Sequence, residues 1–188
     1  MKIVFLDIDG VVATTNSLYE ELSRCFGIPA QDLHKGTPGD WCTKTELSYP
    51  NVSVYQWPLS RKAIENIYQL QLATKCHFVL SSSWRHIGTI NECTEILSTA
   101  GLRINFIGKT GNGKTRGEEI NHWIEKVFPI EFPDKSIESY IIIDDDIDYD
   151  IIQTHDRSVC VKTNFLTGFT KSHLKESVAK LLKFEIIK

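Results

Sequence analysis

Short apolar segments that suit buried β-strands alternate with amphipathic segments that suit α-helices along most of this chain. The strand-like segments are residues 2–7, 77–81, 103–107, 140–143 and 158–162, and the helix-like segments are residues 17–26, 59–74, 88–100, 117–128 and 171–183. The strand-like segments are nearly continuous apolar runs, which is typical of parallel strands covered on both faces. The alternation therefore predicts an α/β fold, a Rossmann-like three-layer α/β/α sandwich around a mostly parallel sheet.

The regular pattern is interrupted once. Residues 35–58 are rich in glycine, proline and tryptophan and form a long irregular segment. The chain has 188 residues, a length that suits one domain over residues 1–188. We expect residues of about 13–58 to form a small cap or insertion after the first strand.

The composition excludes several classes of protein. The chain is 41% hydrophobic and 24% charged, which is ordinary for a globular protein, and its net charge of −3 gives no general attraction to nucleic acids or anionic membranes. Five cysteines without a CxxC pair indicate free thiols in a reducing compartment. No apolar run approaches membrane-spanning length. We expect a cytoplasmic protein without a membrane contact, and no protein partner can be inferred.

Polar side chains follow three of the expected strands, at the points where the strands end. Asp7 and Asp9 follow the first strand, residues 81–85 (SSSWR) follow the second, and residues 144–148 (DDDID) follow the fourth. A basic, glycine-rich segment, residues 108–120, precedes that fourth strand. Ligands of open α/β sheets bind beyond the carboxyl ends of the strands. We therefore expect these groups to meet at one edge of the sheet.

The residue types at this edge fit phosphoryl transfer. Crowded carboxylates repel one another without a counter-ion, and an all-oxygen cluster suits Mg²⁺. A carboxylate in line with a phosphorus atom can attack it, and a second acid can protonate the leaving oxygen. Hydroxyl groups and cations can neutralise the phosphoryl oxygens. Asp7 and Asp9 are thus interpreted as a nucleophile and its acid/base partner.

Four motifs resemble those of the haloacid dehalogenase (HAD) superfamily of phosphatases. In chain order they read FLDIDGVV, FVLSSSWR, KTRGEEI and YIIIDDDID, and the resemblance spans roughly residues 2–170. The SSSWR form and the later VKTNFLTGFT resemble one branch more closely. That branch comprises the HAD phosphatase domains of RNA-repair enzymes and polynucleotide 3′-phosphatases.

The resemblance implies roles for the acids. Asp7 resembles the nucleophile and a metal ligand, and Asp9 resembles the general acid/base with its backbone carbonyl on the metal. Asp144 and Asp145 resemble the acidic pair that holds Mg²⁺. Because the acidic run has three consecutive aspartates and Asp148 follows, the register of this pair stays open by one residue.

The resemblance also implies a phosphate-binding set. Ser81 resembles the phosphate-binding hydroxyl, although Ser82 or Ser83 could take this role. Arg116 resembles the third-motif cation, with Lys114 as its alternative. Arg85 is a candidate for a second phosphate contact, the competing interpretation being a surface ion pair.

A competing motif overlaps the basic segment. Residues 108–115, GKTGNGKT, match the spacing of a phosphate-binding P-loop. A P-loop normally follows the first strand of its domain, whereas this segment lies between late elements. We favour a basic loop that delivers Arg116 or Lys114 to the substrate.

The sequence thus predicts a Mg²⁺-dependent phosphomonoesterase that acts through an aspartyl-phosphate on nucleotides or nucleic-acid 3′-phosphate ends. Alternatives are a phosphatase of free nucleotides or other small metabolites, and a non-catalytic phosphate-binding domain. The pair Asp7 and Asp9 argues against the latter, because binding alone needs no acid/base group. Trp41, Trp57 and Trp84 could stack on a nucleobase, although a role in the core is the favoured interpretation.

Overall fold

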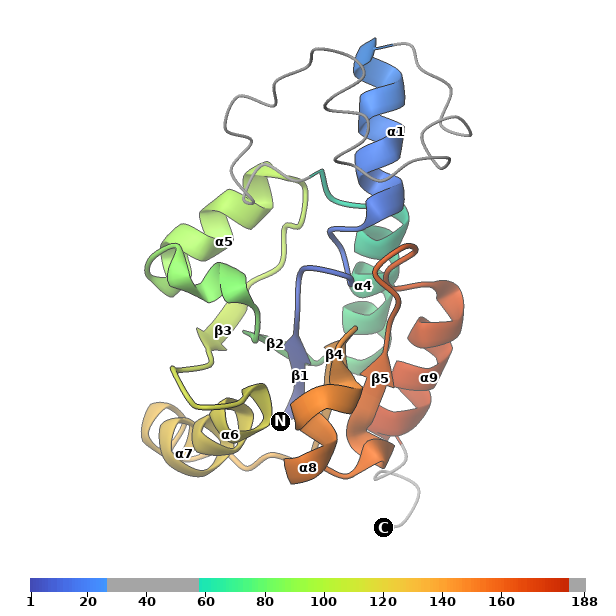
Figure 1. Ribbon diagram of the computed structural model, residues 1–188. Helices are drawn as coiled ribbons and strands as arrows, with labels where there is room; N and C mark the ends of the chain where they lie inside the picture. Colours follow the sequence, from blue (N-terminus) through green and yellow to red (C-terminus); the bar gives the residue numbers. More distant parts are fainter. Residues whose placement is uncertain (27–57, 183–188) are drawn as a thin grey trace.

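The computed structural model describes residues 1–26 and 58–182, and a parallel sheet lies at its centre (Figure 1). The strands are β1 (Lys2–Leu6), β2 (His77–Leu80), β3 (Phe106–Lys109), β4 (Ser139–Asp144) and β5 (Cys160–Lys162). Their order in the sheet is β3-β2-β1-β4-β5, and every pair is parallel. In the central strand β1, Val4 lies opposite Phe78 of β2 and Ile141 of β4. The predicted α/β class is confirmed.

Helices follow most strands, as the sequence predicts. They are α1 (Thr15–Phe26), α4 (Arg61–Thr74), α5 (Ile90–Thr99), α6 (Arg116–His122), α7 (Phe128–Glu131), α8 (Ile152–Thr154) and α9 (Lys171–Leu182). Irregular turns join them: 3₁₀ turns at Ser83–His86 and Arg157–Val159, and π-helical turns at Trp123–Val127 and Ile147–Ile151. Hydroxyl side chains begin three of the helices, because Ser60, Thr89 and Thr115 accept backbone N–H groups of α4, α5 and α6.

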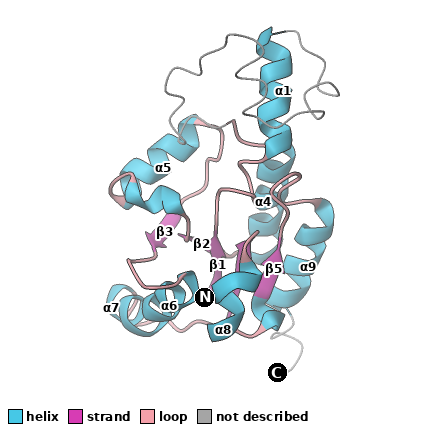
Figure 2. Ribbon diagram, viewed as in Figure 1, coloured by secondary structure: helices cyan, strands magenta, loops and turns pink. Residues whose placement is uncertain are grey.

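The strands are enclosed by helices, which form the outer layers (Figure 2). Alternate residues of β1 enter different hydrophobic clusters, since successive strand residues point to opposite faces of a sheet. Val4 and Leu6 pack in a cluster with residues of α4, α5 and α9, whereas Ile3 and Phe5 pack with residues of α6, α7 and the two π-helical turns. The two cores confirm the three-layer arrangement.

Two expected elements differ in the structure. The strand expected at 103–107 is β3 at Phe106–Lys109, because the chain leaves α5 through a left-handed turn at Gly101 and buries Leu102 and Ile104 before it joins the sheet. The helix expected at 117–128 is not one continuous α-helix. It widens into a π-helical turn before Pro129, which lacks the N–H group of a regular helical bond.

The expected insertion over residues 13–58 is only partly described. Its first part is helix α1, which begins at Thr15, two residues before the predicted start. Residues 27–57, with Trp41 and Trp57, lie outside the described residues. Within residues 1–26 and 58–182, none of the helices combines the length and apolar character that crossing a membrane requires.

Candidate active site

The candidate site lies where the order of the strands reverses. The chain passes from β1 to β2 and β3 on one side, and then crosses to β4 on the other side of β1. Asp7 follows β1 directly, and its backbone N–H donates to Ile143 O at 3.0 Å, so that the pairing with β4 continues to the sheet edge. Asp144 is the last residue of β4. Parallel sheets bind ligands at such reversal points.

Three carboxylates converge at this edge. Asp7, Asp144 and Asp145 each offer one oxygen, and these oxygens lie within 4.8 Å of one another. Asp7 and Asp144 are buried, and Asp145 is half-buried. The structure therefore brings Asp144 and Asp145 together with Asp7. Asp148 instead forms ion pairs with two cations at the surface, Arg157 and Lys162.

The surroundings disfavour the charged forms of these acids. Burial and the neighbouring Asp144 raise the pKa of Asp7 well above its usual range, although Arg116 and a hydrogen bond from Ser82 act in the opposite direction. Burial likewise raises the pKa of Asp144 to about 6, and it raises the pKa of Asp145. A close, all-oxygen set of carboxylates in need of positive charge fits a hard divalent cation such as Mg²⁺.

Gly10 turns the chain beside this cluster. Its φ of 68° lies in the left-handed region, which favours glycine. A Cβ atom at this position would overlap the Asp145 carboxylate. The Gly10 carbonyl accepts a hydrogen bond from Thr163 Oγ1 at 2.8 Å, which ties the turn to the segment after β5. Glycine thus allows Asp145 to approach the strand end.

Asp9 lies outside the cluster of three carboxylates, although it is near enough to raise the pKa of Asp145. The indole Nε1 of Trp84 lies 3.1 Å from its Oδ1 and 3.2 Å from its Oδ2, and Ser83 Oγ lies 3.2 Å from Oδ2. Trp84 is fully buried, which confirms the core role favoured for this residue. Its side chain therefore serves the site from the core and is not free to stack on a base.

The three serines have different surroundings. Ser82 hydrogen-bonds to Asp7 and also caps the 3₁₀ turn after β2. The Ser81 hydroxyl is buried and has no hydrogen-bond partner among the described residues. Ser83 contacts Asp9. Ser81 and Ser82 thus remain the candidates for binding phosphate.

The two candidate cations also differ. Arg116 begins α6, with Nη1 3.7 Å from Asp7 Oδ1 and bonded to the Ser81 carbonyl. Its backbone N–H donates to Asp150 Oδ2 at 2.8 Å. Lys114 lines a cavity of about 250 Å³ that Arg116 and Asp144 also line. Arg116 is therefore the cation that the structure brings beside Asp7.

Arg85 occupies a third kind of position. Its Nη2 forms a buried ion pair with Glu119 Oε1 at 2.6 Å, its Nη1 donates to the Ser82 carbonyl at 2.8 Å, and its Nε donates to the Gly111 carbonyl at 3.2 Å. The surface ion pair considered for Arg85 is thus a buried one. Because all three nitrogens have acceptors in the protein, this geometry favours a brace between two loops over a free phosphate ligand.

The order of elements around residues 108–115 fits a P-loop, but the loop does not leave all of its backbone donors open to an anion. Residues 108–115 begin within the last two residues of β3 and run directly into α6, as in the strand–loop–helix order of a P-loop. However, the Gly113 N–H donates to Glu119 Oε1 at 3.0 Å. A carboxylate of the protein thus takes a backbone donor that a P-loop would offer to phosphate.

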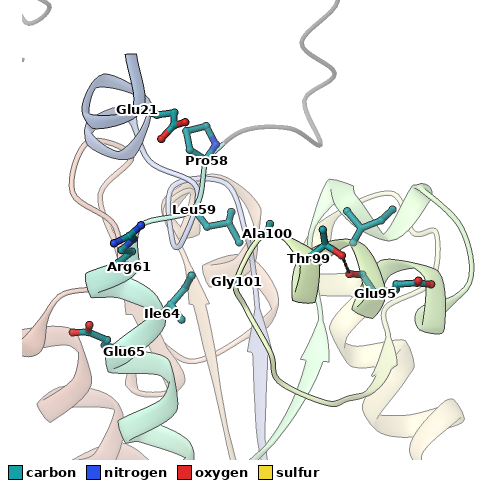
Figure 3. Close-up of a pocket in the computed structure, with 11 residues that line it drawn as sticks. Glu21, Pro58, Leu59, Arg61, Ile64, Glu65, Glu95, Thr99, Ala100 and Gly101 are labelled. Carbon is teal, nitrogen blue, oxygen red and sulfur yellow. Dashed lines mark hydrogen bonds between the residues drawn. The ribbon is translucent and has the colours of Figure 1, made fainter. Parts of the chain in front are cut away.

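A second, larger cavity does not include the carboxylates of the candidate site. It has a volume of about 960 Å³ and is lined by residues of α1, α4 and α5, with Pro58 and Leu59 (Figure 3). None of the predicted site residues lines it. We place the chemistry at the smaller, polar cavity because Lys114, Arg116 and Asp144 line it, and Asp144 adjoins the other two carboxylates of the cluster.

Four residues of this site were not predicted from the sequence. They are Ser83 and Trp84 as partners of Asp9, Glu119 as partner of Arg85, and Asp150 as partner of Arg116. Glu119 lies within the motif KTRGEEI, and Asp150 follows the motif YIIIDDDID. The partner of each residue depends on how the turns fold.

A comparison with known protein families agrees with the motifs. Residues 3–174 match the model of a family described as the HAD domain in Swiss Army Knife RNA repair proteins. Among solved structures, the chain is similar to a haloacid dehalogenase-like family hydrolase from Streptococcus pneumoniae, with 14% identity and a TM-score of 0.45 over 94% of this chain and 90% of that chain. No curated protein matches the chain.

Proposed function

Since the chain belongs to the family of HAD domains in Swiss Army Knife RNA repair proteins, and membership of this family supports hydrolase activity, we propose that it is a Mg²⁺-dependent phosphomonoesterase. The observation that carries this proposal is the division of the acids. Asp7 lies in a buried carboxylate cluster beside Arg116, whereas Asp9 is held separately by hydrogen-bond donors. A nucleophile and an acid/base group need such different surroundings.

The residues for a metal ion are present. Asp7, Asp144 and Asp145, together with the Asp9 carbonyl that the resemblance implies, would hold Mg²⁺, whose charge would offset the carboxylates and the phosphoryl oxygens. The raised pKa of Asp7 and of Asp144 means that the ionised cluster needs such a positive charge. HAD domains generally use this ion.

The proposed reaction has two steps. An Asp7 oxygen bonds to phosphorus while the bond from phosphorus to the leaving oxygen breaks, and that oxygen takes the proton held by Asp9. Water then attacks the phosphorus of the aspartyl-phosphate and gives a proton to Asp9, while the bond from phosphorus to the Asp7 oxygen breaks. Phosphate leaves, Asp7 is again a carboxylate and Asp9 again holds its proton. Arg116 and a serine hydroxyl neutralise the phosphoryl oxygens during transfer.

The proposed substrate is a nucleotide or a nucleic-acid end that carries a 3′-phosphate. The description of the matched family as a domain of RNA repair proteins supports this class. The net charge of −3 is compatible with it, because one terminal phosphate needs only a local site. Free nucleotides and other small phosphate esters are the alternative substrates.

The test is phosphate release with Mg²⁺, and with EDTA as the control. The substrates are a 3′-phosphorylated oligonucleotide, a 5′-phosphorylated one, and free 3′- and 5′-nucleoside monophosphates. We expect Mg²⁺-dependent turnover with a preference for the 3′-phosphorylated oligonucleotide, and loss of turnover in Asp7→Asn. Preference for free nucleotides would contradict nucleic-acid ends as the substrate and favour the alternative class. Absence of turnover of every ester would favour a non-catalytic binding domain.

A further inference from the structure

The Asp9 carboxylate is bound on one side by a group from the hydrophobic core. Trp84 is fully buried and belongs to the cluster that also contains Leu6 and Leu80. Only its Nε1 is polar, and this nitrogen lies within 3.2 Å of both oxygens of Asp9. A single donor shared by both oxygens restrains the position of the carboxylate, and the separate contact from Ser83 Oγ to Oδ2 restrains its rotation.

The backbone that carries Trp84 is held by several hydrogen bonds. Trp84 lies in the 3₁₀ turn Ser83–His86, which Ser82 caps directly after β2. The Trp84 carbonyl accepts the Ile87 N–H at 3.1 Å and lies 3.5 Å from Cys93 Sγ of α5. The indole is therefore fixed both by its backbone and by the surrounding core.

Indole chemistry suits this task. The Trp Nε1–H donates a hydrogen bond but cannot accept one. It can therefore hold Asp9 without removing the proton that the leaving oxygen needs. Ser83, which is exposed, adds a second contact to Oδ2 from the solvent side.

We propose that Trp84 and Ser83 are positioning residues that aim the Asp9 carboxyl group at the leaving oxygen of the substrate. This inference rests on the proposed function, because it assigns residues to the protonation step of that reaction. A correctly positioned general acid contributes roughly 100- to 10,000-fold to a rate. The contribution is largest for a poor leaving group such as a sugar alkoxide, and small for p-nitrophenolate, which departs without a proton.

The test compares kcat/KM for two esters, a 3′-phosphorylated oligonucleotide and p-nitrophenyl phosphate. This parameter reports the steps up to departure of the leaving group, so that hydrolysis of the aspartyl-phosphate does not mask the effect. Trp84→Phe removes the N–H group and keeps an aromatic ring. We expect its kcat/KM to fall about 10- to 100-fold on the oligonucleotide, and several-fold less on p-nitrophenyl phosphate.

Two further variants separate positioning from stability. Ser83→Ala changes an exposed residue, and we expect the same leaving-group dependence with a smaller loss. Trp123→Phe is the matched control, because Trp123 is also buried but packs in the other hydrophobic cluster. We expect this control to leave the ratio of the two kcat/KM values unchanged.

The outcomes are distinct. Equal losses on both esters in Trp84→Phe and Ser83→Ala, or no loss in either, would overturn the positioning role while Mg²⁺-dependent turnover by the wild-type protein still supported the proposed function. Absence of turnover of either ester by the wild-type protein would overturn the proposed function, and this inference with it.

Discussion

Single atoms decide how closely the carboxylates of this site can approach one another. The Asp145 carboxylate occupies the space that a Cβ atom on residue 10 would fill, and the φ of 68° at Gly10 is one that other residues rarely adopt. Both constraints fall on the same residue. The glycine of the first motif therefore allows Asp145 to take its place in the acidic cluster.

We predict that Gly10→Ala lowers the free energy of unfolding by about 1–3 kcal/mol, because it adds backbone strain and displaces Asp145. The same displacement weakens the response of the thermal midpoint to Mg²⁺. Urea unfolding measures the change in stability, and thermal melting with and without Mg²⁺ measures the change in the Mg²⁺ response. Gly111→Ala is the control, since a Cβ atom there would meet nothing within 4 Å. Unchanged stability and an unchanged Mg²⁺ response in Gly10→Ala would contradict the prediction.

The sequence predicts which acids meet, but it does not predict what holds them. Asp7, Asp144 and Asp145 can be predicted, apart from the one-residue register of the acidic pair, because carboxylates follow β1 and end β4 and because parallel strands end at one edge. The contact from Trp84 to Asp9 cannot be predicted in this way. A buried tryptophan is an ordinary core residue in sequence, and only the 3₁₀ turn after β2 directs its N–H group to the site.

At the scale of elements, one buried ion pair joins the end of β2 to the start of α6. Arg85 and Glu119 are 9% and 5% exposed, and each also binds the intervening loop, at Gly111 and Gly113 respectively. The Ser82 carbonyl is a further acceptor of Arg85. The pair therefore fixes the serine segment relative to the helix that carries Arg116.

We predict that Glu119→Ala lowers the free energy of unfolding by about 3 kcal/mol or more, because Arg85 would remain buried without its counter-charge. Urea unfolding measures the loss. Arg157→Ala is the control, since Arg157 forms its ion pair with Asp148 at the surface, and we expect a change of about 1 kcal/mol or less. The double variant Arg85→Met with Glu119→Leu should regain most of the stability but not the proposed phosphatase activity. Equal losses in Glu119→Ala and Arg157→Ala would argue against the brace.

Boundaries of elements are where sequence and structure differ most. The pattern of apolar residues predicts a strand at 103–107, yet the ladder with β2 begins at Phe106, with an irregularity between Phe78 and Val79. Leu102 and Ile104 are buried in either case, so burial alone cannot tell a strand from an irregular core segment. Hydrogen bonds across the sheet decide this, and they depend on residues far apart in the chain.

At the scale of the whole molecule, the buried carboxylates of the site lower the stability of the folded protein as the pH rises. Burial raises the pKa of Asp144 to about 6, and the pKa of Asp7 and of Asp145 are also raised. Between its ordinary pKa near 3.8 and about 6, native Asp144 holds a proton that the unfolded chain has lost. Because the native state binds more protons there, its stability falls as the pH rises through this window.

We predict that, in EDTA, Asp144 lowers the free energy of unfolding by on the order of 1–3 kcal/mol between pH 4 and pH 6. Mg²⁺ binds the deprotonated carboxylates, so it should raise the thermal midpoint more at pH 7 than at pH 5. Melting curves at both pH values, with Mg²⁺ and with EDTA, measure this difference. Asp144→Asn is the control, and in EDTA it should be stabilised relative to the wild-type protein at pH 7 and not at pH 4. A Mg²⁺ effect that is equal at pH 5 and pH 7 would mean that the ion does not compete with protons at this cluster, and the metal site would then have to lie elsewhere.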